Sequence, residues 1–501
     1  NSVIVGINWR LAPPEVAYIL NDSNAQILFV GEDFFGLVDK ILKDVPSIKK
    51  VICMSGNHSD WSSYINWRDS QKDSICDRES KLTDVAIQMY TSGTTGPPKG
   101  AMISQQNMMY MMKNLQSVYG IYPEDEQLGF LPLAHIAGRM FYTFAVIEAC
   151  STINLIEEPE TAVRDQQEIA PTIHFAVPRV WEKQYSLVTI KVKEATWIGR
   201  WSYEFAVNLG ARVAEQRKKG LVARWWLRVA HFLADFLVLK NIRILLGIDR
   251  CRWLSTAAAP IAPDLIDWFW ALGKPMYEVY GQTECTGIAT ANTSKDYRVG
   301  SVGRATDGTE VVLSEDREIL IKGPGVIQGY WNKPEKTAET FVGDWLHTGD
   351  VGRIDEDGYI YIVDRMKDII ITAGGKNITP SEIENQLKFS PFVSDAVVVG
   401  DKRPYLTCLV MIDQENVTNY AQDKNVPFTN YTSLCHTQEV QDLIWEEIET
   451  VNSKFARVET IKKFRLIDQL LDPEDEELTP TMKLKRKVVN EKYLNLIEEM
   501  Y

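Results

Sequence analysis

The stretch from Tyr90 to Gly100 gathers the side chains best suited to chemistry. It reads Tyr-Thr-Ser-Gly-Thr-Thr-Gly-Pro-Pro-Lys-Gly, so three glycines lie among four hydroxyl side chains and one lysine. Glycines let the backbone curl without Cβ clashes, and the hydroxyls and the charge of Lys99 suit the negative oxygens of a polyphosphate. A Walker A loop is excluded, because it needs Gly before the lysine and Ser or Thr after it. The alternative is a flexible surface linker. The Pro-Pro-Lys-Gly ending, between a predicted strand at Val85–Met89 and a helix from Ser104, favours a phosphate loop over a linker.

Other polar motifs follow along the chain, and the first two could also have a purely structural role. His135, within Leu131–Arg139, alone would be a core histidine. The pentapeptide Tyr280–Glu284 alone would be the turn that begins a helix, but a buried glutamate near a triphosphate needs a cation to offset its charge. Asp350, at the end of Trp345–Asp350, has two acceptor oxygens that suit a vicinal diol.

Together these motifs resemble the adenylate-forming, or AMP-binding, superfamily. The order is the one that the superfamily shows, and the resemblance covers essentially the whole chain. Val177–Lys183 is similar to a stretch of the long-chain fatty acid–CoA ligases, and within these the bubblegum type is the most similar. The resemblance implies that ATP and Mg²⁺ activate a long-chain fatty acid as acyl-AMP with release of pyrophosphate, and that coenzyme A then takes the acyl group.

The resemblance also implies a role for individual residues. It assigns catalysis to Lys483, Glu284 and Thr95, and Mg²⁺ to Glu284. It assigns His135 to the acyl pocket, Lys367 to a hinge, and Gly374, Gly375 and Lys376 to coenzyme A. It assigns ATP and AMP binding to Thr91, Ser92, Gly93, Thr94, Thr95, Gly96, Pro97, Pro98, Lys99, Ala259, Tyr280, Gly281, Gln282, Thr283, Glu284, Cys285, Asp350, Arg365 and Lys483. Lys485 competes with Lys483, which is preferred because an arginine follows it by three residues, as in the family.

Two alternatives to this function stay open. The activated acyl group could be loaded onto a carrier-protein thiol instead of coenzyme A. The chain could also be a non-catalytic nucleotide- or lipid-binding relic, because it starts inside the first α/β region of the family and is expected to be incomplete at its N-terminus. A second difference from the family is Ala258, where a glycine usually precedes Ala-Pro, so the added methyl is expected to narrow the pocket.

The elements that position these motifs alternate between strand and helix, which predicts an α/β protein with parallel sheets. We expect a large N-terminal lobe, residues 1–363, of two parallel-sheet α/β subdomains and a small β-barrel-like subdomain. A hinge at 364–368 joins it to a small, mobile α+β C-terminal lobe at 369–501.

The composition of the chain bears on its binding partners and its cellular compartment. A net charge of −14 over 501 residues argues against general nucleic-acid binding. Seven scattered cysteines without a CxxC pair predict reduced thiols and a cytoplasmic protein. Residues 191–243 differ from the rest, with eleven Lys and Arg against four Asp and Glu. This Trp-rich segment is expected either to contact an anionic membrane peripherally or to be a core helix with a solvated basic face. The oligomeric state is not predicted.

Overall fold

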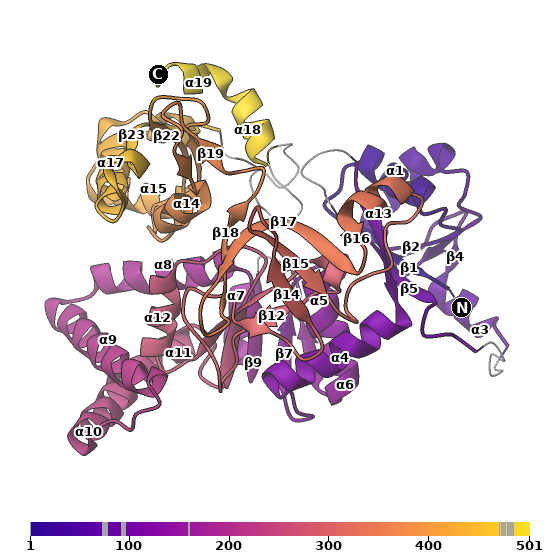
Figure 1. Ribbon diagram of the computed structural model, residues 1–501, viewed down its shortest axis with the longest axis horizontal. Coiled ribbons are helices and arrows are strands. Elements are labelled where there is room, and N and C mark those ends of the chain that lie inside the picture. Colours follow the sequence, from indigo (N-terminus) through magenta and orange to yellow (C-terminus); the bar gives the residue numbers. More distant parts are fainter. Residues whose placement is uncertain are drawn as a thin grey trace.

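The computed structural model describes residues 2–72, 79–91, 97–158, 161–469, 471, 477 and 485–501. A large N-terminal lobe carries a smaller C-terminal lobe on one side, and the chain passes between them after strand β18 (Ile360–Arg365) (Figure 1). Among the described residues, no helix combines the length and apolar character needed to cross a bilayer.

Parallel sheets build most of the N-terminal lobe, as the alternation of strand and helix predicts. Three strands form a small parallel sheet, β2 (Ile27–Val30), β3 (Lys50–Cys53) and β4 (Ser62–Ser63). A second pair is β7 (Glu126–Gly129) and β8 (Thr152–Leu155). The central sheet has parallel strands β9 (Ile173–Ala176), β10 (Trp253–Thr256) and β11 (Met276–Tyr280), followed by antiparallel β12 (Thr290–Ala291) and β13 (Arg304–Ala305).

Helices cover these sheets and bury the main core, which includes Trp181, Phe141 and Phe269. Those before the central sheet are α1 (Pro13–Asp22), α2 (Phe35–Ile41), α3 (Tyr64–Asp69), α4 (Gln105–Tyr119), α5 (Ile136–Arg139), α6 (Ala145–Ala149) and α7 (Ala162–Ile169). Those within and after it are α8 (Pro178–Glu194), α9 (Trp197–Lys218), α10 (Trp225–Ala234), α11 (Lys240–Leu245), α12 (Pro263–Ala271) and α13 (Pro334–Thr340). Two π-helical segments, η3 (Met140–Phe144) and η5 (Asp235–Leu239), interrupt this series.

The glycine-rich loop lies in a β-hairpin, which corrects the predicted order of strand, loop and helix. Strand β5 (Val85–Thr91) pairs in parallel with β1 (Ile4–Gly6) and antiparallel with β6 (Lys99–Ser104), so Thr91 lies opposite Lys99. The buried side chains of β6 make this segment a strand. Helix α4 begins only after Ser104, whose hydroxyl accepts from the amide of Asn107 at 3.2 Å. The N-terminus of a helix therefore does not face the loop directly.

An antiparallel sheet ends the N-terminal lobe and corresponds to the expected small β-rich subdomain. Its strands are β14 (Glu310–Leu313), β15 (Glu318–Lys322), β16 (Phe341–Val342), β17 (Trp345–Ile354) and β18. β17 is the longest and pairs with β15, β16 and β18, so it carries Asp350 at a junction of the sheet.

The C-terminal lobe has the predicted α+β composition. A short hairpin of β19 (Ile370–Ile371) and β20 (Asn377–Ile378) precedes a sheet of β21 (Val393–Val399), β22 (Leu406–Ile412) and β23 (Ile461–Leu466). Its helices are α14 (Pro380–Lys388), α15 (Gln414–Asp423), α16 (Tyr431–Cys435), α17 (Gln438–Asn452), α18 (Arg486–Lys492) and α19 (Leu494–Glu498).

A buried ion pair anchors α18 to this lobe. The guanidinium of Arg486 donates to both carboxylate oxygens of Glu384 at 2.7 and 2.9 Å and to the carbonyl of Val398 at 2.8 Å. Because Glu384 also accepts from the amide of Val398 at 2.7 Å, the pair connects α14, β21 and α18.

We predict that Arg486→Met lowers the stability of the C-terminal lobe by about 3–5 kcal/mol, because it leaves the Glu384 carboxylate buried without its cation. Amide hydrogen exchange of β21 and β22 measures this loss. The matched control is Lys487→Met, which removes an exposed pair with Glu491 at 3.8 Å and should cost under about 1 kcal/mol. Equal losses in the two variants would contradict the anchoring role.

Candidate active site in the cleft between the lobes

A cleft of about 3290 Å³ runs between the lobes, and both contribute to its walls. The N-terminal lobe supplies Lys99, Tyr280 and Asp350 from three different sheets. The C-terminal lobe supplies Lys485 and Arg486 at the start of α18. Residues that are remote in sequence are thus brought to one cavity, large enough for a nucleotide and an acyl chain.

Glu284 and Lys99 meet around one phenol at the floor of the cleft. The hydroxyl of Tyr330 donates to Oε1 of Glu284 at 2.7 Å, and Nζ of Lys99 lies 4.2 Å from the centre of the Tyr330 ring. Burial raises the pKa of the Tyr330 phenol, and so does its contact with Glu284, so the phenol stays a donor at neutral pH. Burial lowers the pKa of Lys99, and the charge of Glu284 opposes that shift.

This arrangement fits a divalent cation bound together with phosphate. Only one oxygen of Glu284 accepts from Tyr330, and the residue is 8% exposed in the cleft wall. The described residues hold no cluster of three or more His, Cys, Asp or Glu side chains that could bind a metal by itself. Mg²⁺ would therefore take most of its ligands from phosphate and water, as this ion commonly does.

Asp350 forms a second polar centre on the same wall. Its Oδ2 accepts from the hydroxyl of Tyr280 at 2.6 Å, and Nε of Arg365 lies 3.4 Å from Oδ1. Asp350 and Arg365 are opposite each other on β17 and β18, so the sheet register sets this pair. Burial raises the pKa of Tyr280 well above its ordinary value, and the Asp350 charge adds to this rise. The hydrogen bond from Tyr280 therefore fixes one oxygen of Asp350 and holds the carboxylate in place on the wall.

Buried polar atoms without a partner lie at the ends of β10 and β11. They are Oγ1 of Thr256, Oε2 of Glu278 and Nε2 of Gln282, and all three residues line the cleft. Thr256 and Glu278 are register partners on the two parallel strands. Burial raises the pKa of Glu278 to about 8, so this carboxyl is mostly protonated at pH 7. Leaving these three polar atoms buried and unpaired costs free energy. Together they offer hydrogen-bond donors and acceptors that fit the polar edge of a nucleotide base.

The turn after β10 carries the alanine that replaces the usual glycine. Ala258 has φ +73, in the left-handed region that disfavours any residue with a Cβ. Strain of this kind is held in place by the surrounding structure and occurs at functional sites. Ala258 and Ala259 both line the cleft, so the substitution lies where the sequence places the pocket.

The turn after β11 needs its glycine for a different reason. A Cβ at Gly281 would lie 1.5 Å from the carbonyl oxygen of Gly287, so no other residue fits. Gly281, Gln282, Thr283 and Glu284 line the cleft, whereas Cys285 is buried behind the turn in the core of the antiparallel sheet. The Cys285 thiol therefore does not reach the cavity.

The described ends of the glycine-rich loop, Thr91 and Pro97–Lys99, line the cleft. Asp22 fixes their surroundings, because it accepts from the hydroxyl of Tyr90 at 2.8 Å and from Nζ of Lys333 at 2.7 Å. Ser92, Gly93, Thr94, Thr95, Gly96 and Lys483 lie outside the described residues.

His135 begins helix α5, where its Nδ1 accepts from the amide of Ala137 at 3.2 Å, and it lines the cleft as well. The interpretation of His135 as a pocket residue is compatible with this position.

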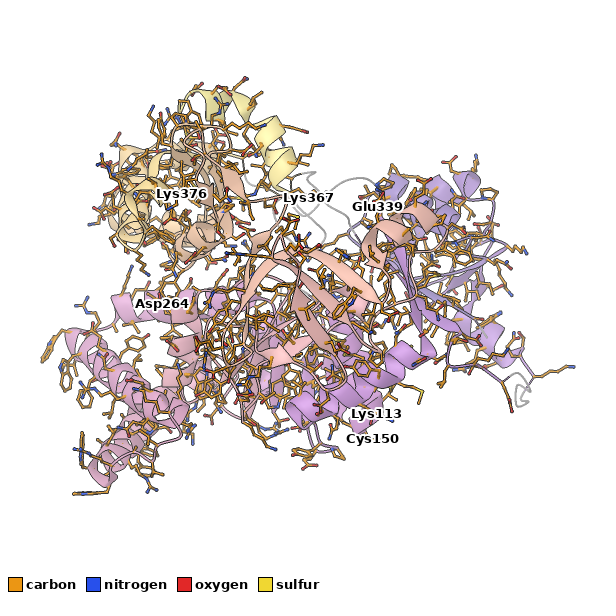
Figure 2. All side chains as sticks on the ribbon, viewed as in Figure 1. Lys113, Cys150, Asp264, Glu339, Lys367 and Lys376 are labelled. Carbon is orange, nitrogen blue, oxygen red and sulfur yellow. The ribbon has the colours of Figure 1, made fainter. Side chains whose placement is uncertain are left out.

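The other assigned residues lie at the junction of the lobes or beyond it. Lys367 lies between the lobes and lines the cleft, whereas Lys376 is on the C-terminal lobe away from it (Figure 2). The turn of Gly374 and Gly375 is not part of the cleft wall. In this arrangement of the lobes, the residues assigned to coenzyme A are therefore separated from the residues assigned to ATP.

Contacts across the junction hold the lobes in this arrangement. Arg179 of α8 donates to the carbonyl and the hydroxyl of Ser394 at 2.7 and 2.8 Å, and the rings of Tyr185 and Phe389 stack with centroids 4.6 Å apart. Asp364, at the end of β18, accepts from the hydroxyl of Ser381 in α14 at 2.8 Å. The last strand of the large lobe is thus tied to the first long helix of the small one.

Three residues of the site were not found from the sequence: Tyr330, Glu278 and Thr256. Glu278 could have been noticed, because it is the charged residue in the otherwise apolar or aromatic strand Met276–Tyr280. Tyr330 lies in no motif and is 46 positions from Glu284, so only the fold brings the two together.

Two family models match this chain. The AMP-binding enzyme family model matches residues 1–331, and the model of the AMP-binding enzyme C-terminal domain matches residues 367–501. The chain is 37% identical to the putative fatty-acid–CoA ligase fadD11 of Mycobacterium tuberculosis, over 83% of this chain and 74% of that protein. It is 30% identical to the long-chain-fatty-acid–CoA ligase ACSBG1 of Rattus norvegicus, over 100% of this chain and 74% of that protein.

A solved structure gives the same fold. The anthranilate CoA ligase AuaEII, in complex with anthranoyl-AMP, superimposes with a TM-score of 0.72 at 20% identity, over 98% of this chain and 82% of that one. The AMP-binding enzyme model covers well over half of the sequence, which is sufficient to assign the family. The chain belongs to the AMP-binding enzyme family.

Proposed function

We propose that this enzyme is a long-chain fatty acid–CoA ligase. A carboxylate oxygen of the fatty acid attacks the α-phosphorus of ATP and pyrophosphate leaves, and the thiol of coenzyme A then attacks the acyl carbon and AMP leaves. The observation that carries the proposal is the single cleft that gathers Glu284, Lys99 and Asp350 with the start of α18. The names of the relatives, which are fatty-acid–CoA ligases, support the choice of acid and acceptor.

The first step needs positioning and charge stabilisation more than acid–base chemistry, because a carboxylate is already a nucleophile. In our proposal Asp350 binds the ribose hydroxyls, and Thr91–Lys99 with Thr95 holds the leaving pyrophosphate. Mg²⁺, held partly by Glu284, supplies positive charge to the phosphates when bound. Lys483 stabilises the charge that develops between the carboxylate and the α-phosphate.

The second step requires a different arrangement of the lobes. We propose that the C-terminal lobe turns about Lys367, which moves Lys483 away from the acyl-adenylate and carries Gly374, Gly375 and Lys376 towards coenzyme A. The few contacts across the junction, such as Arg179 with Ser394, would break in this motion.

We also infer a cytoplasmic enzyme that meets membranes peripherally. The cysteines that the structure describes are free, as expected in a reducing compartment. Long-chain acids partition into bilayers, so an enzyme that uses them benefits from access to a membrane surface.

Substrate choice is tested by measuring pyrophosphate release across saturated acids of different length, with and without coenzyme A. We expect the highest kcat/KM for long-chain acids and an acyl-CoA product identified by mass spectrometry. Best turnover with acetate or another short acid would contradict the substrate. Product formation only with a carrier-protein thiol would favour the alternative acceptor.

The role of Lys483 is tested by Lys483→Ala. Pyrophosphate release should fall by roughly 100- to 1,000-fold, the loss typical of a group that stabilises transition-state charge, while thioester formation from supplied acyl-AMP is largely kept. Lys485→Ala is the matched control, since Lys485 precedes α18 as its capping residue. If Lys485→Ala lost adenylation and Lys483→Ala kept it, the assignment would be reversed.

Asp350→Ala should raise the ATP concentration for half-maximal rate by roughly 10- to 150-fold, because a hydrogen bond to a charged group is worth about 1.5–3 kcal/mol. Asp350→Asn keeps the shape and one acceptor and should fall between. Asp344→Ala, in the turn between β16 and β17 and in an exposed pair with Lys322, is the control and should leave the ATP dependence unchanged. An unaltered dependence in Asp350→Ala would show that the ribose binds elsewhere.

A further inference from the structure

Helices α9 and α10 with η5 project from the N-terminal lobe (Figure 1). Large apolar side chains on these helices are exposed and form an apolar surface. We call this the aromatic face, and its principal residues are Trp197, Trp201 and Phe205 on α9 and Trp225, Phe232 and Phe236 on α10–η5. These six side chains are between 52% and 77% exposed. Large contiguous apolar surfaces on a protein mark sites of interaction.

The aromatic face is not an incomplete core. Each helix already buries its opposite side, through Leu209 and Ala214 on α9 and through Leu227 on α10. Helix α9 packs closely against α12: a Cβ at Gly210 of α9 would lie 2.0 Å from the carbonyl oxygen of Ala271 in α12. The stripe of Trp225, Val229, Phe232 and Phe236 therefore points outward, and the interpretation of this segment as an ordinary core helix is wrong.

Basic side chains surround the aromatic face. Arg200, Arg224, Arg228 and Lys240 are exposed and form no ion pair with another described residue. Of the four acidic residues in 191–243, Glu215 and Asp235 are each bound to a neighbouring cation, whereas Glu194 and Glu204 form no ion pair with another described residue. The segment thus keeps a positive rim in a protein whose net charge is −14.

The positive rim favours a bilayer over a second copy of the chain. A symmetric dimer through this face would bring the positive rim of one copy against the positive rim of the other, and like charges in contact oppose association. Anionic headgroups neutralise such a rim instead, and Trp and Phe beside Arg and Lys are the typical composition of a helix that lies in the membrane interface.

The aromatic face also adjoins the cleft. Leu187, Ile190 and Lys191 of α8 line the cleft, and α9 starts directly after α8, at Trp197. A surface that rests on a bilayer at the start of α9 therefore lies next to the part of the cleft wall that α8 forms, in which Leu187 and Ile190 are apolar and Lys191 is basic.

We propose that the aromatic face of α9 and α10–η5 inserts among the headgroups of an anionic bilayer and docks the enzyme beside its substrate. This docking deepens the proposed peripheral contact, but it depends on the surface alone and holds even if the acid specificity is wrong.

Vesicle flotation at 0.15 M NaCl tests the proposal directly, with the full chain and no substrate. The wild type should bind phosphatidylcholine vesicles that contain 30% phosphatidylserine, and bind pure phosphatidylcholine more weakly. The variant Trp225→Ser, Phe232→Ser, Phe236→Ser should lose roughly tenfold or more of its partitioning to both vesicles. Arg224→Glu with Arg228→Glu should lose binding to the anionic vesicles alone, together with its salt dependence.

The matched control replaces three apolar residues of similar exposure on other elements, Ile65, Ile147 and Leu155, by serine, and should bind like the wild type. Thermal unfolding shows whether each variant is folded. Equal binding of the wild type and the aromatic-face variant would overturn the proposal. So would a wild type that ignores vesicles and forms dimers in sedimentation velocity that the aromatic-face variant loses, because the face would then be an interface between copies.

Discussion

The negative charge of a carboxylate in the wall of a cleft has to be compensated. The geometry of the site follows from the contacts that compensate the charge of Glu284. Tyr330 donates to one of its oxygens, and Lys99 lies over the ring of the same tyrosine. These residues come from the turn after β11, from a loop before α13 and from β6. The three segments must therefore be held in place before any substrate arrives. A triphosphate with its cation adds charge of both signs at this point, which the preorganised carboxylate of Glu284 and ammonium of Lys99 can meet without rearrangement.

Because these charged groups must be in place before substrate binds, the two lobes have different roles in the site. The large lobe holds fixed groups, such as Asp350 at the junction of an antiparallel sheet, where register sets the contact with Arg365. The small lobe carries α18, and the buried pair of Arg486 with Glu384 fixes the start of this helix. A rotation of the small lobe about the junction would therefore move the start of α18 relative to the fixed groups of the large lobe without breaking this pair.

Much of this architecture could be predicted from the sequence, since the alternation of strands and helices and the family motifs are local patterns. The features that could not be predicted are those that depend on contacts between residues far apart in the sequence. The helix expected directly after the glycine-rich loop is preceded by β6, because Gly100–Ser104 pairs with β5. The Trp225 stripe shows helical periodicity whether it faces a core or the exterior, so periodicity could not decide between them. Tyr330 becomes part of the site only through folding, whereas Glu278 could be recognised as a charge in an otherwise apolar or aromatic strand.

In the proposed mechanism, one cleft makes an acyl phosphate anhydride before any thiol is involved. A single-turnover experiment without coenzyme A tests it most directly, with enzyme in excess over ATP, with Mg²⁺ and hexadecanoate in excess over the enzyme, and with quenched samples analysed by mass spectrometry. The account predicts hexadecanoyl-AMP and pyrophosphate in equal amounts, and conversion of the adenylate to acyl-CoA and AMP when coenzyme A is added. Formation of ADP and phosphate, or the absence of any adenylate until a thiol is supplied, would contradict it.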